Sequence, residues 1–181
     1  MPTAATSEIR KPATDTDLLG HWQVEPRASH ACFRARTLAG LVESSGQFRS
    51  IAGWIVVDGA VVAGALVIGP SSIETGNRIR DRHLRSRAFF DVARHPQIRY
   101  EARSVSPAER GKARIDGELI VAGNRTHLPL EVSVRTLSEE RVELACETEV
   151  DRLALGVRGA RMMVPRAVQL DVAVTLRRAG R

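Results

Sequence analysis

Apolar and polar side chains alternate cleanly along three segments of this chain. In 128–135, every second residue from Leu128 to Val134 is apolar, and mostly polar residues fall between them. The same two-residue period runs through 141–150 and 168–177. Because successive side chains of a strand point to opposite faces, this period predicts strands with one buried and one solvent-exposed face.

Weaker alternation extends the pattern along the chain. It occurs in five further segments: 29–37, 47–58, 61–69, 97–105 and 113–121. Turn residues separate several of these segments, among them Asp58 with Gly59, the stretch 107–112, and Gly123 with Asn124, as expected of hairpins. Sequential hairpins make neighbouring strands antiparallel. We therefore predict an all-β fold, an eight-stranded antiparallel β-barrel built as a meander that closes on itself.

One segment lacks the alternation. Between Ile73 and Pro96 the apolar residues fall at mixed spacings, which suit one or two short helices better than a strand. Pro96 ends the segment, because proline lacks an N–H and restricts the residue before it. We predict a short helical insert around residues 77–92 that lies across a face or a mouth of the barrel.

The length of the chain fits one domain. At 181 residues it can bury enough surface to fold without a disulfide or a metal. We assign residues 20–179 to the barrel domain and 1–19 to a disordered leader with little to pack against a core. The leader has no apolar run of signal-peptide length, and no later segment has the length of a membrane span. We therefore expect a cytoplasmic protein.

Positive charge gathers in and beyond the predicted insert. The formal net charge is +6, and lysine occurs only at Lys11 and Lys112, so arginine carries nearly all of the cationic charge. Between Arg78 and Arg103, eight arginines face three carboxylates. Such an excess favours an anionic partner, which can be a nucleic acid, a membrane surface or a ligand head group. A solvated surface explains the excess equally well.

Familiar motifs for chemistry do not occur in the sequence. Cys32 and Cys146 form neither a C-x-x-C motif nor a zinc-type pair and are interpreted as small apolar strand residues, while a disulfide between them stays open. The five histidines include no H-x-H or H-E-x-x-H pair, so we expect no metal. No G-x-S-x-G, P-loop or G-x-G-x-x-G motif occurs. We expect no catalytic residue and no required cofactor.

Several short motifs stand apart from the strand pattern. The segment 72–76 reads SIETG, 80–86 reads RDRHLRS and 89–92 reads FFDV, with Pro96 just beyond. Further matches are Trp22, Pro26, Ser29, His30, Phe33, Gly46, Phe48, Gly53, Asp58, Gly117, Leu119, Gly123, Val150, Asp151, Arg152, Gly156 and Val157. Over residues 21–176, the chain resembles the YceI-like family.

This resemblance implies a lipocalin-like barrel whose lumen holds a polyisoprenoid, either an isoprenyl pyrophosphate or the tail of an isoprenoid quinone. An eight-stranded barrel is just wide enough for side chains or one slender ligand. Burying one isoprene unit is worth about 3–4 kcal/mol before ordering costs are subtracted. The sequence departs from the family at Ile120, where a threonine is usual, and at Leu155, where an aromatic residue is usual. We expect the pocket wall to differ near Leu155.

Twelve apolar residues are candidates for the lumen or its lid. They are Phe48, Ile51, Trp54, Val56, Leu66, Ile68, Leu84, Phe89, Phe90, Ile98, Tyr100 and Leu119. Trp54 and Phe90 are the strongest of them, since large aromatic side chains commonly line apolar pockets. Ordinary core packing explains each of the twelve at least as well. The face that each side chain takes near Gly53 depends on whether a bulge shifts the alternation there.

Four polar residues are candidates for binding a ligand head group: Arg80, Asp81, His83 and Arg152. Arginine holds pyrophosphate through forked, charge-assisted hydrogen bonds. Ion pairs near the end of an element explain Asp81 and Arg152 better than ligand binding does. A lone histidine such as His83 is more often a hydrogen-bonded residue than a ligand or a base.

Other functions stay open beside an apolar lipid carrier. Nucleic-acid binding is favoured by the arginine excess and disfavoured by the small number of aromatic residues, since seven offer little for base stacking. An enzyme acting on a bound isoprenoid would use His83 and Asp81 as acid and base. Alternatively, the arginine-rich insert docks the barrel mouth on an anionic membrane, where lipid is loaded. The sequence is compatible with a homodimer and with a monomer.

Overall fold

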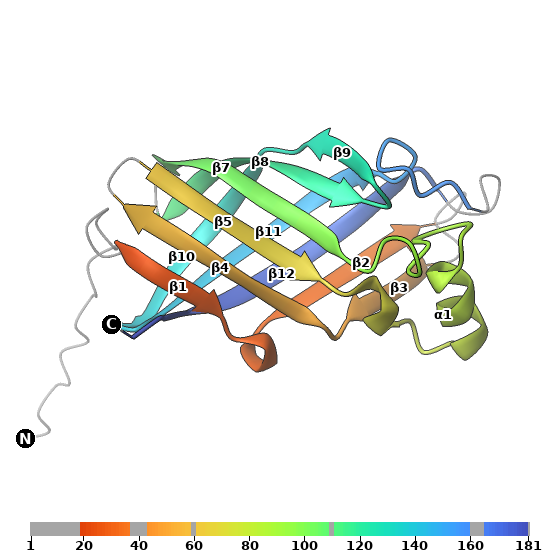
Figure 1. Ribbon diagram of the computed structural model, residues 1–181, viewed down its shortest axis with the longest axis horizontal. Coiled ribbons are helices and arrows are strands. Elements are labelled where there is room, and N and C mark those ends of the chain that lie inside the picture. The colour runs from red at the N-terminus through yellow and green to blue at the C-terminus, as the bar shows by residue number, and fades with distance from the viewer. Residues whose placement is uncertain (1–18, 37–42, 59–60, 109–110, 160–164, 181) are drawn as a thin grey trace, which may run out of the picture.

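The computed structural model describes residues 19–36, 43–58, 61–108, 111–159 and 165–180. Its long elements are all strands, joined antiparallel into one sheet (Figure 1). The strands are β1 (Gly20–Val24), β2 (His30–Arg36), β3 (Glu43–Phe48), β4 (Ile51–Asp58), β5 (Val61–Ile68), β6 (Ile73–Glu74), β7 (Ile98–Ala108), β8 (Lys112–Val121), β9 (Asn124–His127), β10 (Leu130–Ser138), β11 (Arg141–Asp151) and β12 (Ala167–Arg178). Residues 1–18 of the expected leader, and the predicted turn at Gly59, lie outside the described residues.

The sheet closes on itself. Following the hydrogen-bonded neighbours gives the order β1-β4-β5-β7-β8-β10-β11-β12, and β12 pairs with β1 to complete the ring. Trp22 of β1 lies opposite Arg178 of β12 on one side and opposite Ile55 of β4 on the other. The predicted eight-stranded antiparallel barrel is therefore confirmed, and its strands follow one another as a meander.

The barrel wall contains two strands that are each built in two pieces. β1 and β2 are separated by a 3-10 helix, Pro26–Ala28, which forms where proline fixes φ and removes a ladder donor. β2 continues along the N-terminal half of β12, and β3 continues the line of β4 by pairing with β2. The prediction found β2 and β4 but missed β1 and most of β3. β6 extends this edge by two residues.

Hydrogen bonds from β12 carry the wall across the break. The Glu25 N–H donates to the Thr175 carbonyl at 2.8 Å, and the Thr175 N–H donates to Ser29 Oγ at 3.0 Å. Ser29 Oγ itself donates to the Glu25 carbonyl at 2.7 Å. Thr175 is only 3% exposed, so water cannot replace these partners.

The turn between β8 and β9 lies one residue earlier than the sequence predicted, at Ala122 and Gly123 rather than at Gly123 and Asn124. Val121 pairs with Asn124, so Ala122 and Gly123 alone make the turn. Both have positive φ, 46° and 79°. Two successive left-handed residues match the twist of a two-residue hairpin, and glycine at the second position carries no Cβ penalty there.

The predicted insert contains one short helix, α1 (Arg78–Arg85), followed by turns up to residue 94. Asn77 caps it by accepting from the N–H groups of Ile79 and Arg80 at 3.0 and 3.1 Å. A side-chain acceptor at this position satisfies donors that the first helical turn leaves unpaired. Figure 1 shows α1 packed at one end of the barrel, away from the end where both termini of the ribbon lie.

Apolar side chains fill the barrel at both ends. The cluster at the end that carries α1, called here the α1-end cluster, has as its buried members Phe89, Ile98, Leu119, Val121, Val150, Leu155 and Val157. A second cluster joins Trp22, Val142 and Leu176 near the opposite end. A third, around Ala113, Ile115 and Val132, lies along the wall of β8 and β10. What remains open inside the barrel therefore lies between its two filled ends.

Replacing Ser29 with alanine tests the bridge across the break. We expect a loss of about 1–2 kcal/mol in the free energy of unfolding, because the buried Thr175 N–H loses its acceptor. Ser133→Ala is the matched control: its hydroxyl also donates to a backbone carbonyl but is exposed, so a change within about 0.5 kcal/mol is expected. Chemical denaturation measures both. Equal effects from the two variants would contradict the bridging role.

Candidate functional site

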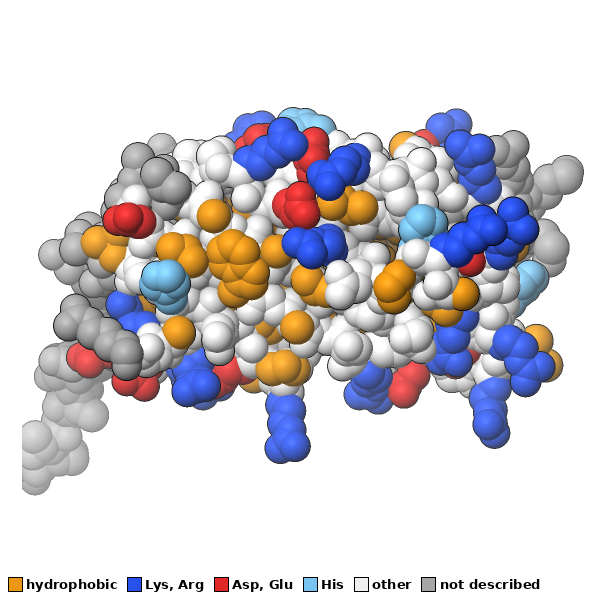
Figure 2. Space-filling view, viewed as in Figure 1, with side chains coloured by type: hydrophobic (Ala, Val, Ile, Leu, Met, Phe, Trp, Pro, Cys, Tyr) orange, Lys and Arg blue, Asp and Glu red, His pale blue; other side chains and the backbone are white. Residues whose placement is uncertain are grey.

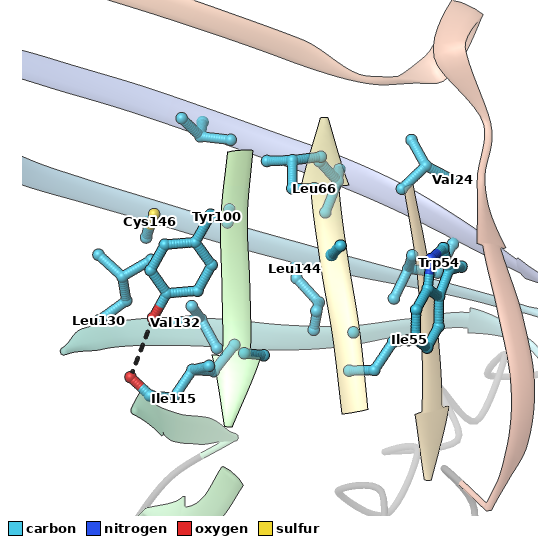
Figure 3. Close-up of a pocket in the computed structure, with 17 residues that line it drawn as sticks. Val24, Trp54, Ile55, Leu66, Tyr100, Ile115, Leu130, Val132, Leu144 and Cys146 are labelled. Carbon is cyan, nitrogen blue, oxygen red and sulfur yellow. Dashed lines mark hydrogen bonds between the residues drawn. The ribbon is translucent and has the colours of Figure 1, made fainter. Parts of the chain in front are cut away.

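An apolar cavity of about 100 Å³ lies inside the barrel. All eight strands of the closed ring contribute to its wall, as Figure 3 shows for part of it. The lining residues are Val24, Trp54, Ile55, Gly64, Ala65, Leu66, Tyr100, Ala102, Ile115, Leu130, Val132, Leu144, Ala145, Cys146, Val172, Val174 and Leu176. No charged residue is among them. The cavity can therefore accommodate hydrocarbon and offers no counter-charge to an ion.

Tyr100 brings a hydroxyl group to this apolar wall. Its O–H donates to the Leu128 carbonyl at 2.9 Å and lies 3.4 Å from the Ile115 carbonyl, the contact drawn dashed in Figure 3. Burial raises the pKa of Tyr100 well above its ordinary value, and the charges of Asp116 and Cys146 add to the rise. The phenol is thus neutral and already hydrogen-bonded, so the wall stays apolar in character.

Gly117 makes room for the Tyr100 ring. A Cβ atom built at Gly117 would lie 2.7 Å from the Tyr100 hydroxyl oxygen and 2.5 Å from the Glu101 carbonyl oxygen. The ring therefore lies directly over the β8 backbone. Any larger residue at this position would collide with the ring and with the Glu101 carbonyl.

Eight of the twelve predicted lumen residues come together in the α1-end cluster. These are Phe48, Ile68, Leu84, Phe89, Phe90, Ile98, Tyr100 and Leu119. They pack on one another, with Phe48 and Phe90 in an edge-to-face contact at 5.9 Å between ring centroids. Within this group, Tyr100 also lines the cavity. Leu66, a predicted lumen residue outside the cluster, lines the cavity as well. The cluster therefore borders the cavity through Tyr100.

The other predicted lumen residues, Ile51, Trp54 and Val56, do not share one face of β4. The pairing of β4 with β5 runs without a register shift from Ile51 to Asp58, so no bulge alters the alternation near Gly53. Ile55 packs in the core with Trp22, which places Trp54 and Val56 on the outer face. Trp54 is one of the residues that line the cavity although its side chain is 48% exposed, and Ile51 is buried.

Sequence reasoning missed fourteen of the seventeen lining residues. They are Val24, Ile55, Gly64, Ala65, Ala102, Ile115, Leu130, Val132, Leu144, Ala145, Cys146, Val172, Val174 and Leu176. Most of them are the apolar members of the three clearest alternating segments and of the segment 113–121. That alternation was the signal that could have identified them, since the inward face of a closed barrel is also its lumen.

Two of the polar candidates hold the loop before α1. The N–H and the hydroxyl of Thr75 donate to Asp81 Oδ1 at 2.9 and 2.6 Å. Arg80 Nε donates to Thr75 Oγ1 at 2.8 Å, and its Nη2 donates to the Thr75 carbonyl at 2.6 Å. Asp81 is 8% exposed. These side chains clamp the loop onto the helix, and neither lines the cavity.

Arg152 is 4% exposed and holds the loop after β11. Its Nη1 donates to the carbonyls of Val157 and Gly159 at 2.7 and 2.9 Å. Next to it, Asp151 accepts from Arg166 Nη2 at 2.6 Å, and this bond together with the Leu153 N–H lowers the pKa of Asp151. The two residues thus pin this loop.

His83 lies on α1 with its ring edge-on to Phe89, at 5.3 Å between centroids. It does not line the cavity, and Asp81 is already bonded to Thr75. The structure therefore does not bring His83 and Asp81 together over the cavity as an acid–base pair. The cysteines are free, with Cys146 in the cavity wall, where burial and then Asp171 raise the pKa of its thiol.

Metal and membrane-spanning features are absent from the part of the chain that the structure describes. Within it, no group of three or more histidine, cysteine or acidic residues is placed to hold a metal ion. None of the helices found among these residues has the length and hydropathy needed to cross a bilayer.

A closed eight-stranded barrel with an apolar interior defines the class of lipocalin-like barrels. The family model for the YceI-like domain matches residues 22–176. The chain belongs to the YceI-like family, as its motifs indicated.

Solved structures share the fold at low sequence identity. BcnA from Burkholderia cenocepacia is 18% identical with a TM-score of 0.75, over 84% of this chain and 98% of that one. A polyisoprenoid-binding domain from Saccharophagus degradans, implicated in plant cell wall breakdown, is 15% identical with a TM-score of 0.75, over 87% and 98%. A UPF0312 protein of Ectopseudomonas mendocina (strain ymp) is 32% identical over 59 residues, which span 33% of this chain and 31% of that relative.

Tyr100 is the single tyrosine of the chain, so an alkaline titration reports on it alone. Its raised pKa means that the folded state keeps the phenol proton above the ordinary value of about 10, where the unfolded state loses it. Stability is therefore undiminished by this group below pH 10 and falls as pH rises above it. We expect tyrosinate absorbance to appear only together with unfolding. Its appearance in a barrel that retains its circular dichroism would contradict the buried, bonded phenol.

Proposed function

We propose that the protein binds a long apolar lipid in its barrel lumen, with a polyisoprenoid chain as the ligand class. The observation that carries this proposal is the apolar cavity lined by every strand of the closed ring. Transfer of hydrocarbon from water into such a cavity is favourable in proportion to the area buried. Membership of the YceI-like family supports the same ligand class.

The size of the cavity bears on how a ligand enters. A volume of about 100 Å³ has room for a short segment of one slender hydrocarbon chain. A longer tail must displace side chains of the α1-end cluster, where most of the predicted lumen and lid residues gather. The residues Phe89, Phe90 and Leu84 then act as the lid that a long tail opens.

The head group of the ligand lies outside the lumen in this proposal. The cavity offers no charge, and Arg80 and Arg152 already bond carbonyl oxygens. An isoprenoid quinone, with a neutral head, therefore suits the site better than an isoprenyl pyrophosphate does. The proposal assigns binding rather than catalysis to this site, and the bond of Asp81 to Thr75, which occupies one member of the candidate acid–base pair, supports that assignment.

The direct test is native mass spectrometry of protein purified without detergent from its natural host, followed by lipid extraction under denaturing conditions. We expect a stoichiometric isoprenoid to be released on unfolding. A protein that is empty and that also fails to take up added isoprenoids, whether quinone or pyrophosphate, would overturn the proposal. The cytoplasmic location expected from the sequence stays a prediction, which fractionation of the host cells tests.

Filling the cavity should abolish uptake. Cys146→Phe places a ring into the lumen wall, and we expect affinity for a polyisoprenoid to fall at least about tenfold, at a stability cost of about 1–3 kcal/mol. Cys32→Phe is the matched control, because Cys32 pairs with Asp171 on the outer face of the wall. Titration with a fluorescent isoprenoid measures both variants. Unchanged uptake by a folded Cys146→Phe protein would place the ligand elsewhere.

A further inference from the structure

Ile79 on α1 is the most exposed large apolar side chain in the described part of the protein. It is 79% exposed, against 48% for Trp54 and 38% for Leu19. A single exposed apolar residue is ordinarily unremarkable. Here its setting is unusual, because the side chains around it on the helix are cationic or titratable.

Arg78, Arg82 and His83 surround Ile79. On a helix, residues three and four positions apart share a face, so Arg82 and His83 lie beside Ile79, and Arg78 precedes it directly. All three are exposed. We call Arg78, Ile79, Arg82 and His83 the α1 surface.

The arginines of the α1 surface lack acidic partners among the described residues. Neither Arg78 nor Arg82 makes an ion pair there, whereas many arginines elsewhere do. The paired ones include Arg49 with Glu74, Arg103 with Glu118, Arg135 with Glu143 and Arg166 with Asp151. Asp81, the one acidic residue of α1, is buried and bonded to Thr75. Figure 2 shows blue side chains gathered at this end of the molecule, where few red ones lie between them.

α1 presents this surface on a fixed support. Asn77 caps its first turn, Arg80 bonds Thr75, and Arg85 Nη2 donates to the Ile73 carbonyl at 2.8 Å. Leu84, on the inner side of the helix, packs against the α1-end cluster. The exposure of Ile79 is therefore built into a well-anchored helix rather than produced by fraying.

We propose that the α1 surface docks on an anionic lipid bilayer, with Ile79 inserted among the head groups and Arg78 and Arg82 on lipid phosphates. In such a bilayer, the phosphates lie above the hydrocarbon. The arginines of the α1 surface match the phosphate layer, and Ile79 matches the hydrocarbon beneath it. With eight residues, α1 can lie in the interface and cannot span it. Nucleic acid offers the same phosphates, but these do not lie above a hydrocarbon layer into which Ile79 could insert.

The proposed docking does not depend on what the lumen holds, although the α1 surface and the lumen are neighbours. α1 covers the end of the barrel that the α1-end cluster fills. Docking through α1 therefore brings this filled end of the barrel against the membrane.

Co-sedimentation with vesicles tests the docking. The full-length protein is mixed with vesicles of phosphatidylcholine alone or of phosphatidylcholine with phosphatidylglycerol, at low and at high salt. We expect binding only to the anionic vesicles and its loss at high salt. Arg78→Gln with Arg82→Gln should weaken partitioning about fivefold for each arginine, and Ile79→Ser about tenfold. The matched control is Arg27→Gln with Arg114→Gln, which removes the same charge from exposed positions outside α1 and should bind like the wild type.

Each contrary result has a definite meaning. Equal binding to neutral vesicles, or Ile79→Ser and arginine variants that bind like the control, would overturn the proposal. Retention on DNA with no binding to vesicles would overturn it in favour of a nucleic-acid surface. The Cys146→Phe variant should still bind vesicles, which separates this proposal from that of lipid uptake. A polarity-sensitive dye attached at Ile79→Cys, with Cys32 and Cys146 replaced by serine, should report an apolar environment on anionic vesicles alone.

Discussion

The pairing of β12 with three neighbours holds this barrel closed. It pairs with β11 along Arg141–Asp151, with β1 near its C-terminal end and with β2 nearer its N-terminal end. Between the last two, the polar contacts of Thr175 replace ladder bonds that Pro26 interrupts. Without this strand β1 and β11 would be open edges with unpaired backbone groups. The wall of the lumen is continuous only because this seam is complete.

The closed seam divides the chemistry of the side chains into two regions. Inside, the hydroxyl of Tyr100 is already bonded to a backbone carbonyl, so recognition there depends on shape and length. Outside, arginine and carboxylate side chains pair across neighbouring strands, for example Arg135 with Glu143. α1 departs from this pattern, because Arg78 and Arg82 have no acidic partner among the described residues and lie beside the exposed Ile79. Apolar and electrostatic recognition are thus assigned to different parts of one small domain.

Alternation predicted the barrel because its strands are half-buried along nearly their whole length. β8 alternates between buried and more exposed residues from Ala113 to Val121, and β10 does so from Leu130 to Arg135, before its register with β11 shifts. β3 was missed because Glu43–Phe48 is mostly polar and buries little. The candidate site was less predictable: Trp54 faces outward because β4 keeps an unbroken register, and buried Asp81 and Arg152 serve loop geometry. Sequence spacing alone does not reveal the phase of a strand or the partners of a buried charge.

The place of β12 in the chain imposes an order on folding. Trp22 pairs with Arg178, so the contact that closes the ring joins residues near opposite ends of the sequence. Contacts of such long range are expensive in chain entropy and make folding slow. During synthesis, β1 and β11 each keep one unpaired edge until β12, Ala167–Arg178, has left the ribosome. A chain cut short before this strand would therefore be an unfinished sheet prone to pair with other copies, rather than a smaller barrel.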